Sequence, residues 1–154
     1  MASARTPAAA ALTGLVLDTF RANGLLVAWG DRFAAAEGLT SARWQMLGAI
    51  ALAPAPLTAP EIASFMGVSR QGAQKQLDRL VEEGLVERSP NPQHARSPLY
   101  ALSERGRTAY DRMDRRWNQR AAALAQACRP NDVAAGHREL SALMSELAHD
   151  LERP

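Results

Sequence analysis

Residues 57–106 constrain the fold of this chain more than any other stretch. Their first part, LTAPEIASFMGVSRQGAQKQLDRLVEEGLVER, carries apolar residues at helical spacing, with a break at Gly67 and an end at Gly84. Such spacing is typical of amphipathic helices, and glycine readily adopts the left-handed backbone that ends a helix. The stretch therefore predicts two helices joined by a tight turn, which is the arrangement of a helix-turn-helix.

Capping signals agree with these two helices. Thr58 and Glu61 have the spacing of a capping box, in which each side chain accepts a hydrogen bond from the other residue's amide. Pro60 is tolerated in a first turn because amides there have no intrahelical partner, and Ser69 is placed to cap the second helix. The residues expected to face inward on the second helix are Ala73, Leu77, Leu80 and Val81.

The outward face of the second helix is polar and basic at its start. Arginine can pair with guanine, glutamine with adenine, and lysine with guanine or phosphate. No acid occurs between Ser69 and Leu77, whereas Asp78 and Glu82 follow. Because such helices read base edges with their N-terminal residues, this pattern predicts binding to the major groove of double-stranded DNA. The candidate contacts on this helix are Ser69, Arg70, Gln71, Gln74, Lys75 and Arg79.

A two-stranded wing is predicted after Gly84. Residues 85–88 and 99–102 are short strand candidates, and the loop between them is rich in proline, asparagine and serine. Arg96 lies near the tip of that loop, where an arginine suits the narrow, electronegative minor groove. Arg96 is therefore the candidate DNA contact of the wing.

Long helices are predicted on both sides of this region. An apolar stripe runs from Leu12 to Phe33; Ser103 is placed to cap a helix that Pro130 ends, and Asn131 to cap a final helix. Helices this long extend beyond a small winged core, so their stripes need another surface, most simply a second copy of the chain. The alternative is that the helices fold back within one chain. The candidate dimerisation residues are Leu12, Leu15, Val16, Leu140, Leu143, Met144, Leu147 and Leu151.

Composition limits the other classes of function. The 154 residues suit one domain with appendages, and a net charge of +2 means that any DNA-binding surface must be local. The single cysteine excludes an intrachain disulfide and suits a reducing cytoplasm. We expect no membrane span, because no run approaches about 18 apolar residues. Asp18 and Arg21 also interrupt any export signal, so a cytoplasmic location is expected.

No catalytic or metal-binding motif is recognisable. His94, His137 and His149 do not have the spacing of metal ligands on one face of a helix, and neither CxxC nor HExxH occurs. Ser69 and Ser103 are placed as helix caps rather than as nucleophiles. We therefore predict no enzymatic activity, no metal site and no cofactor.

An ordered set of motifs resembles the MarR family of bacterial transcriptional regulators. The segments that carry the resemblance are LTSARWQML (39–47), LT and EIA within 57–63, VSRQG (68–72), LDRLVEEGLVER (77–88) and LSERG (102–106). One position departs from the family: His94 stands where the wing usually has an aspartate that helps to hold it. The resemblance is close over residues 39–106, and the flanks match only as long helices.

The resemblance implies a mainly α fold with a small two- or three-stranded β wing: a winged helix-turn-helix core flanked by long dimerisation helices. The boundaries expected are a mobile arm at 1–8, the DNA-binding domain at 38–106, and a helical dimerisation region at 9–37 and 107–154. A two-fold dimer would place two recognition helices about one DNA turn apart, which predicts a pseudo-palindromic operator.

The resemblance also implies repression by operator occupancy, relieved by a small aromatic or phenolic effector. In this family the pockets that bind effectors lie between the dimerisation helices and the winged core. The candidate pocket residues here are Phe20, Trp29, Arg43 and Trp44. The identity of the effector, the target genes and the sign of regulation stay open at this point.

Two alternatives remain. Cys128 could make the protein a redox-responsive regulator, although its place on the stripe from Trp117 to Leu124 predicts an inert, packed thiol. The winged helix could instead be a protein-interaction module, which would bind DNA weakly and with little dependence on salt.

Overall fold

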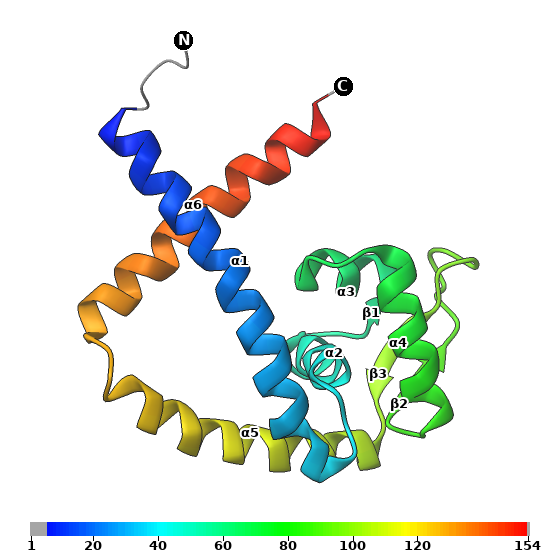
Figure 1. The fold of residues 1–154 in the computed structure, drawn as a ribbon. Coiled ribbons are helices and arrows are strands. Elements are labelled where there is room, and N and C mark those ends of the chain that lie inside the picture. The colour runs from blue at the N-terminus through cyan, green and yellow to red at the C-terminus, as the bar shows by residue number, and fades with distance from the viewer. Residues whose placement is uncertain (1–5, 154) are drawn as a thin grey trace. The chain divides into compact units, whose positions relative to one another are not determined.

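The computed structural model describes residues 6–153 (Figure 1). Within these residues ten elements follow one another: α1 (Pro7–Ala34), a short 3-10 turn (Ala35–Glu37), α2 (Ser41–Leu52), β1 (Leu57–Thr58), α3 (Ala59–Met66), α4 (Arg70–Glu82), β2 (Val86–Ser89), β3 (Leu99–Leu102), α5 (Glu104–Ala125) and α6 (Pro130–Glu152). The predicted fold class, mainly helical with a small β wing, is confirmed.

The chain divides into two compact units, and the boundary lies inside α5. The first unit ends at Met113, and the second begins at Asp114. The first unit contains the helix-turn-helix and the wing, together with α1 and the start of α5. The second contains the rest of α5 and all of α6. The expected bounds of the DNA-binding domain, 38–106, stay a prediction.

The core of the first unit joins the helix-turn-helix to the sheet and to α5. Its largest fully buried side chains are those of Tyr100, Leu47, Ile62, Leu77, Leu80, Met113 and Val86. The predicted inward face of α4 is confirmed, since Ala73, Leu77 and Leu80 are fully buried and Val81 packs at the edge of the core. Burial of this face fixes the orientation of α4 and leaves its other side exposed.

Local hydrogen bonds form the predicted caps and turns. The Glu61 amide donates to Thr58 Oγ1 at 3.4 Å, and the Thr58 amide donates to Glu61 Oε2 at 2.7 Å, which completes the capping box. The Gly72 amide donates to Ser69 Oγ at 3.0 Å. Gly67 ends α3 with a left-handed φ of 62°, as expected for a residue without Cβ steric cost.

The sheet has three antiparallel strands in the order β1-β3-β2, so the wing gains a third strand from residues 57–58. β2 begins at Val86 rather than at the predicted Leu85. The reason is local, because the Leu85 amide donates to the Leu80 carbonyl at 2.8 Å and so closes the end of α4. The Leu85 carbonyl accepts from the Ser103 amide at 3.1 Å, at the point where α5 begins.

Three expectations outside the winged core were wrong. The predicted arm at 1–8 is too long, because α1 begins at Pro7 with Thr6 as its cap; residues 1–5 lie outside the described residues. Asn131 does not cap α6, which begins one residue earlier at Pro130 and has no side-chain cap. Cys128 is exposed in the turn after α5, because α5 ends at Ala125 and the apolar stripe ends with it.

One segment, Pro7–Glu37, is long and apolar enough to cross a membrane when only length and composition are considered. None of its most apolar stretch is buried within the chain. The core helices of soluble proteins and signal sequences can be equally long and apolar, so this segment alone is weak evidence for a membrane span. The absence of a membrane span stays a prediction.

Candidate nucleic-acid interface

Helix α4 presents a row of exposed polar side chains on one face. Gln71, Lys75 and Arg79 form this row at intervals of four residues, and Arg70 is exposed in the first turn, while Ala73, Leu77 and Leu80 are buried in the core. In Figure 1, α4 and the loop between β2 and β3 lie on the same outer side of the first unit. This geometry leaves the basic face of α4 free to enter a groove.

The N-terminus of α4 adds a second feature. Ser69 uses its hydroxyl to cap the helix through Gly72, so the hydroxyl itself is engaged. The first amides of a helix lack intrahelical partners and lie at the positive end of the helix dipole. This end therefore favours an anion such as a phosphate oxygen.

Gln74 is held more tightly than the sequence indicates. Its amide nitrogen donates to Asp78 Oδ1 at 2.8 Å and to Tyr100 Oη at 3.0 Å. A glutamine amide has two hydrogens, so both are used within the protein. Bidentate pairing with adenine needs one of them, and Gln74 must therefore release a partner before it can read a base in that way. The link to Tyr100 joins residues far apart in the sequence, and no local pattern revealed it.

The wing loop is ordered by hydrogen bonds within the loop. The Gln93 amide donates to Asn91 Oδ1 at 3.0 Å, the His94 amide to the Asn91 carbonyl at 3.2 Å, and the Ser97 amide to the His94 carbonyl at 2.9 Å. These bonds form two successive turns, and Arg96 lies exposed in the second. The loop thus has local structure although His94 occupies the position of the usual aspartate.

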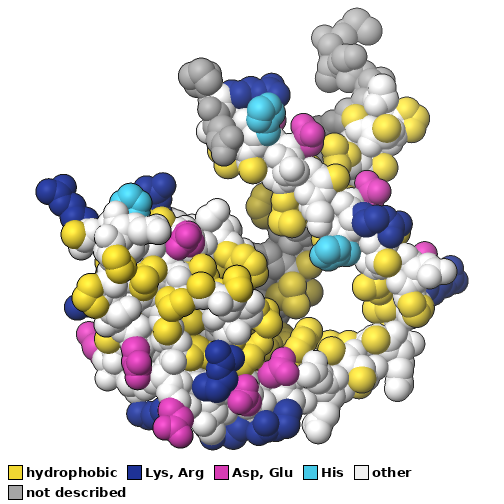
Figure 2. Space-filling view, turned by 180° about the vertical axis from the view of Figure 1, so that it is seen from behind, with side chains coloured by type: hydrophobic (Ala, Val, Ile, Leu, Met, Phe, Trp, Pro, Cys, Tyr) yellow, Lys and Arg dark blue, Asp and Glu magenta, His cyan; other side chains and the backbone are white. Residues whose placement is uncertain are grey.

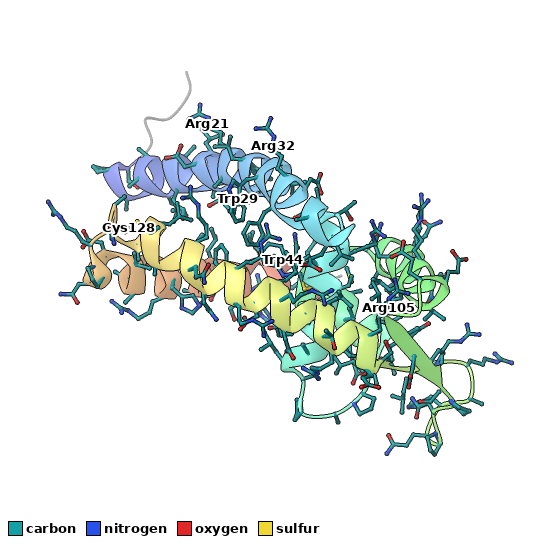
Figure 3. The ribbon with its side chains drawn as sticks, turned by 90° about the horizontal axis from the view of Figure 1, so that it is seen from below. Arg21, Trp29, Arg32, Trp44, Arg105 and Cys128 are labelled. Atoms are coloured by element: carbon teal, nitrogen blue, oxygen red, sulfur yellow. The ribbon has the colours of Figure 1, made fainter. Side chains whose placement is uncertain are left out.

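The candidate effector residues do not form one site. Trp29 stacks on Phe33 with ring centroids 4.7 Å apart, and Phe33 meets Trp44 at 5.2 Å. Figure 3 shows Trp29 on the side of α1 away from Arg21 and Arg32. Phe20 is 73% exposed and lies more than two turns from Trp29 along α1. Phe33, which the sequence placed on the stripe but not in the pocket, is the residue that joins the two tryptophans.

Arg43 has a structural partner rather than a free charge. Its guanidinium pairs with the Glu83 carboxylate and donates to the Gly38 carbonyl at 2.9 Å, with only 13% of the side chain exposed. The pair with Glu83 fastens the start of α2 to the end of α4, and the bond to Gly38 fastens it to the turn before α2. An anionic effector at Arg43 would have to compete with Glu83.

The candidate dimerisation residues leave apolar surface exposed on both units. Leu12 on α1 and Met144, Leu147 and Leu151 on α6 are exposed. Leu15, Val16, Leu140 and Leu143 are partly buried. Figure 2 shows hydrophobic side chains at the surface along α5 and α6. Exposed patches of this kind mark interaction surfaces.

Residues 37–97 match the model of the MarR family. An uncharacterised protein of Mycobacterium tuberculosis is 46% identical over 93 residues, which are 60% of this chain and 64% of that protein. The chain thus spans less than two thirds of that relative's length. The crystal structure of the MarR-family transcription regulator SP03579 has a TM-score of 0.75 at 26% identity, over 93% of this chain and 94% of that one.

Residues 37–97 belong to the MarR family, and the chain has the fold of a MarR-family transcription regulator. Two further structures show the same fold at lower identity. A mutant MarR of Escherichia coli in complex with operator DNA has a TM-score of 0.74 at 23% identity, over 86% of this chain and 94% of that one. CouR of Rhodococcus jostii bound to p-coumaroyl-CoA has a TM-score of 0.65 at 24% identity, over 78% and 83%.

Family membership agrees with the prediction that the chain is not an enzyme, because the MarR family consists of transcription regulators. Within residues 6–153, His, Cys, Asp and Glu side chains form no group of three or more that could hold a metal ion.

Proposed function

We propose that this MarR-family chain is a sequence-specific regulator of transcription that binds a pseudo-palindromic operator as a cytoplasmic homodimer. The observation that carries the proposal is the face of α4, where Arg70, Gln71 and Lys75 are exposed and the opposite side is anchored in the core. The structural likeness to the E. coli protein bound to operator DNA supports it.

The DNA contact proposed for each residue follows from its position in the first unit. Arg70 and Gln71 lie in the first turn of α4, where recognition helices contact base edges. Lys75 and Arg79 follow Gln71 at intervals of four residues, so they continue its face of the helix and are suited to phosphates or to guanine. Arg96, exposed on the wing, is suited to the minor groove. The second α4 would come from the partner copy.

We further propose that the protein is a repressor whose DNA binding a small ligand relieves. A ligand weakens DNA binding only if it prefers a conformation in which the two recognition helices are wrongly spaced. The aromatic cluster of Trp29, Phe33 and Trp44 joins α1 to α2, so a ligand that enters between these rings would move one helix against the other. The structure of CouR with p-coumaroyl-CoA supports an aromatic effector.

The direct test is an operator selected from random DNA and a fluorescence-anisotropy titration of variants on it. Arg70→Ala should weaken binding to that operator by about 1–3 kcal/mol and relax the base preference at one position. Arg96→Ala should weaken binding to all sequences and reduce the salt dependence. Equal affinity of Arg70→Ala and the parent protein for the operator would reject this docking of α4.

The alternative of redox control has one observation in its favour, the exposure of Cys128. If ligand control is correct, Cys128→Ser should bind the operator normally, and peroxide should affect neither protein. Anisotropy titrations before and after peroxide treatment measure this. Loss of operator binding by the oxidised parent but not by Cys128→Ser would establish the redox mechanism instead.

A further inference from the structure

A second apolar site lies within the first unit, away from the aromatic cluster. It is a groove of about 450 Å³ between the end of α2, the loop that follows it, and α3. We call it the α3 groove, and its principal lining residues are Leu52, Pro54, Leu57, Glu61, Ser64 and Phe65. A volume of this size is in the range of small-molecule sites.

The walls of the α3 groove are unusual for a protein surface. Leu52 and Phe65 are 71% and 68% exposed, and both belong to helices whose other faces are buried in the core. Phe65 follows the apolar spacing of α3, so the sequence alone would place it inward with Ile62. Its exposure leaves an aromatic ring and an aliphatic side chain available to a ligand.

The α3 groove carries a single kind of charge. Among the described residues, Glu61 is the only ionisable one in its lining. Both hydrogen bonds from Thr58 are accepted by Oε2, at 2.7 Å each. These bonds lower the pKa of Glu61, so its carboxylate is ionised at neutral pH. Among residues 6–153 no hydrogen bond uses Oε1, which leaves this side of the carboxylate open to a cationic ligand.

We propose that the α3 groove binds lipophilic organic cations, with an apolar body between Leu52 and Phe65 and an ammonium group beside Glu61. The Phe65 ring adds attraction for a cation through its π face. An organic acid of the same size would meet a carboxylate and no basic residue, so it is disfavoured. The site therefore differs in place and in charge preference from the candidate pocket for an aromatic or phenolic effector, whose charged residue is Arg43.

The α3 groove also has a short structural route to α4. Glu61 holds Thr58, which pairs with Leu99 in the sheet, and the neighbouring Leu57 pairs with Tyr100. The Tyr100 hydroxyl accepts the hydrogen bond from Gln74. A cation that draws Glu61 away from Thr58 would thus loosen the strand that positions Gln74. This effect on DNA rests on the proposed function, whereas cation binding does not.

Calorimetric titration of the full chain with three matched probes tests the site: benzyltrimethylammonium, benzyl alcohol and benzoate. The cation should bind most tightly and benzoate most weakly. Glu61→Gln should weaken cation binding about fivefold, near the upper limit for an exposed ion pair, and leave benzyl alcohol unchanged. Glutamine at this position still completes a capping box, so the fold is retained.

Glu82→Gln is the matched control, because it removes an exposed carboxylate of α4 that does not line the groove. It should bind the cation like the parent protein. Equal affinity for all three probes, or an equal loss in both variants, would overturn the proposal. A change in sedimentation mass on Glu61→Gln would also overturn it, since the groove would then be an interface between copies.

The effect of the cation on DNA binding is measured in a separate experiment. With a selected operator, benzyltrimethylammonium should weaken DNA binding by the parent protein more than by Glu61→Gln. Failure of the parent protein to bind any DNA would reject the proposed function and leave the calorimetric result standing. Cation binding without an effect on DNA would reject the route through Thr58 and Tyr100.

Discussion

Replacing Gly106 by alanine should destabilise the first unit by about 3 kcal/mol or more, above the usual cost of overpacking. A Cβ at this position would lie 1.8 Å from the Leu85 carbonyl oxygen and 2.8 Å from its carbonyl carbon. Both atoms belong to the backbone, and that oxygen already accepts from Ser103. The backbone must therefore shift at the junction of α4, the wing and α5. Urea unfolding followed by circular dichroism measures the loss.

Gly48→Ala is the control for Gly106→Ala. It changes the same residue type inside a helix of the same unit, and its new Cβ would meet only Tyr110 Cε2, at an ordinary 3.7 Å. The variant should be as stable as the parent protein or gain about 0.5–1 kcal/mol, because alanine favours a helix interior over glycine. Similar unfolding midpoints for the two variants would contradict the close approach of α5 to Leu85.

Replacing Leu147 by glutamate should dissociate the proposed dimer. Leu147 lies on the exposed apolar stripe of α6 with Met144 and Leu151, and a carboxylate there would be buried without a partner when two copies associate. Sedimentation should then give the mass of one chain, 16.6 kDa. Operator affinity should fall by a hundredfold or more, on the order of the advantage that a second linked site confers.

Ala142→Glu is the matched control for the dimer. It places the same charge on the same helix, but helical periodicity puts it on the side opposite Leu147, where the residue is already exposed. It should leave both mass and operator affinity unchanged. If Leu147→Glu kept twice the monomer mass, the stripe on α6 would not be part of the interface.

The features that the sequence predicted well are those set by neighbouring residues. The capping box of Thr58 and Glu61, the Ser69 cap and the buried face of α4 each depend on residues within a few positions of one another. Such preferences act before any tertiary contact forms. The family resemblance then supplied the order of the elements, which spacing alone does not determine.

The features that were missed depend on contacts between distant segments or on where a helix ends. Nothing local links Gln74 to Tyr100 or Arg43 to Glu83. Cys128 was assigned to a packed stripe because helical periodicity was extended past Ala125, where α5 ends. Phe65 fits the apolar spacing of α3, but α3 has only 8 residues, too few for periodicity to separate an inward residue from one at the edge of the core.

The Arg43–Glu83 ion pair has a mechanical consequence. It is largely shielded from water on the arginine side, and breaking a shielded pair leaves a charge without compensation. A rotation of α2 would therefore move the C-terminus of α4, which Glu83 caps, before it moved the N-terminus, which carries Arg70. Helix α4 would then tilt about its first turn rather than shift along its axis. A small movement of α2 would displace Arg79 and leave Arg70 in place.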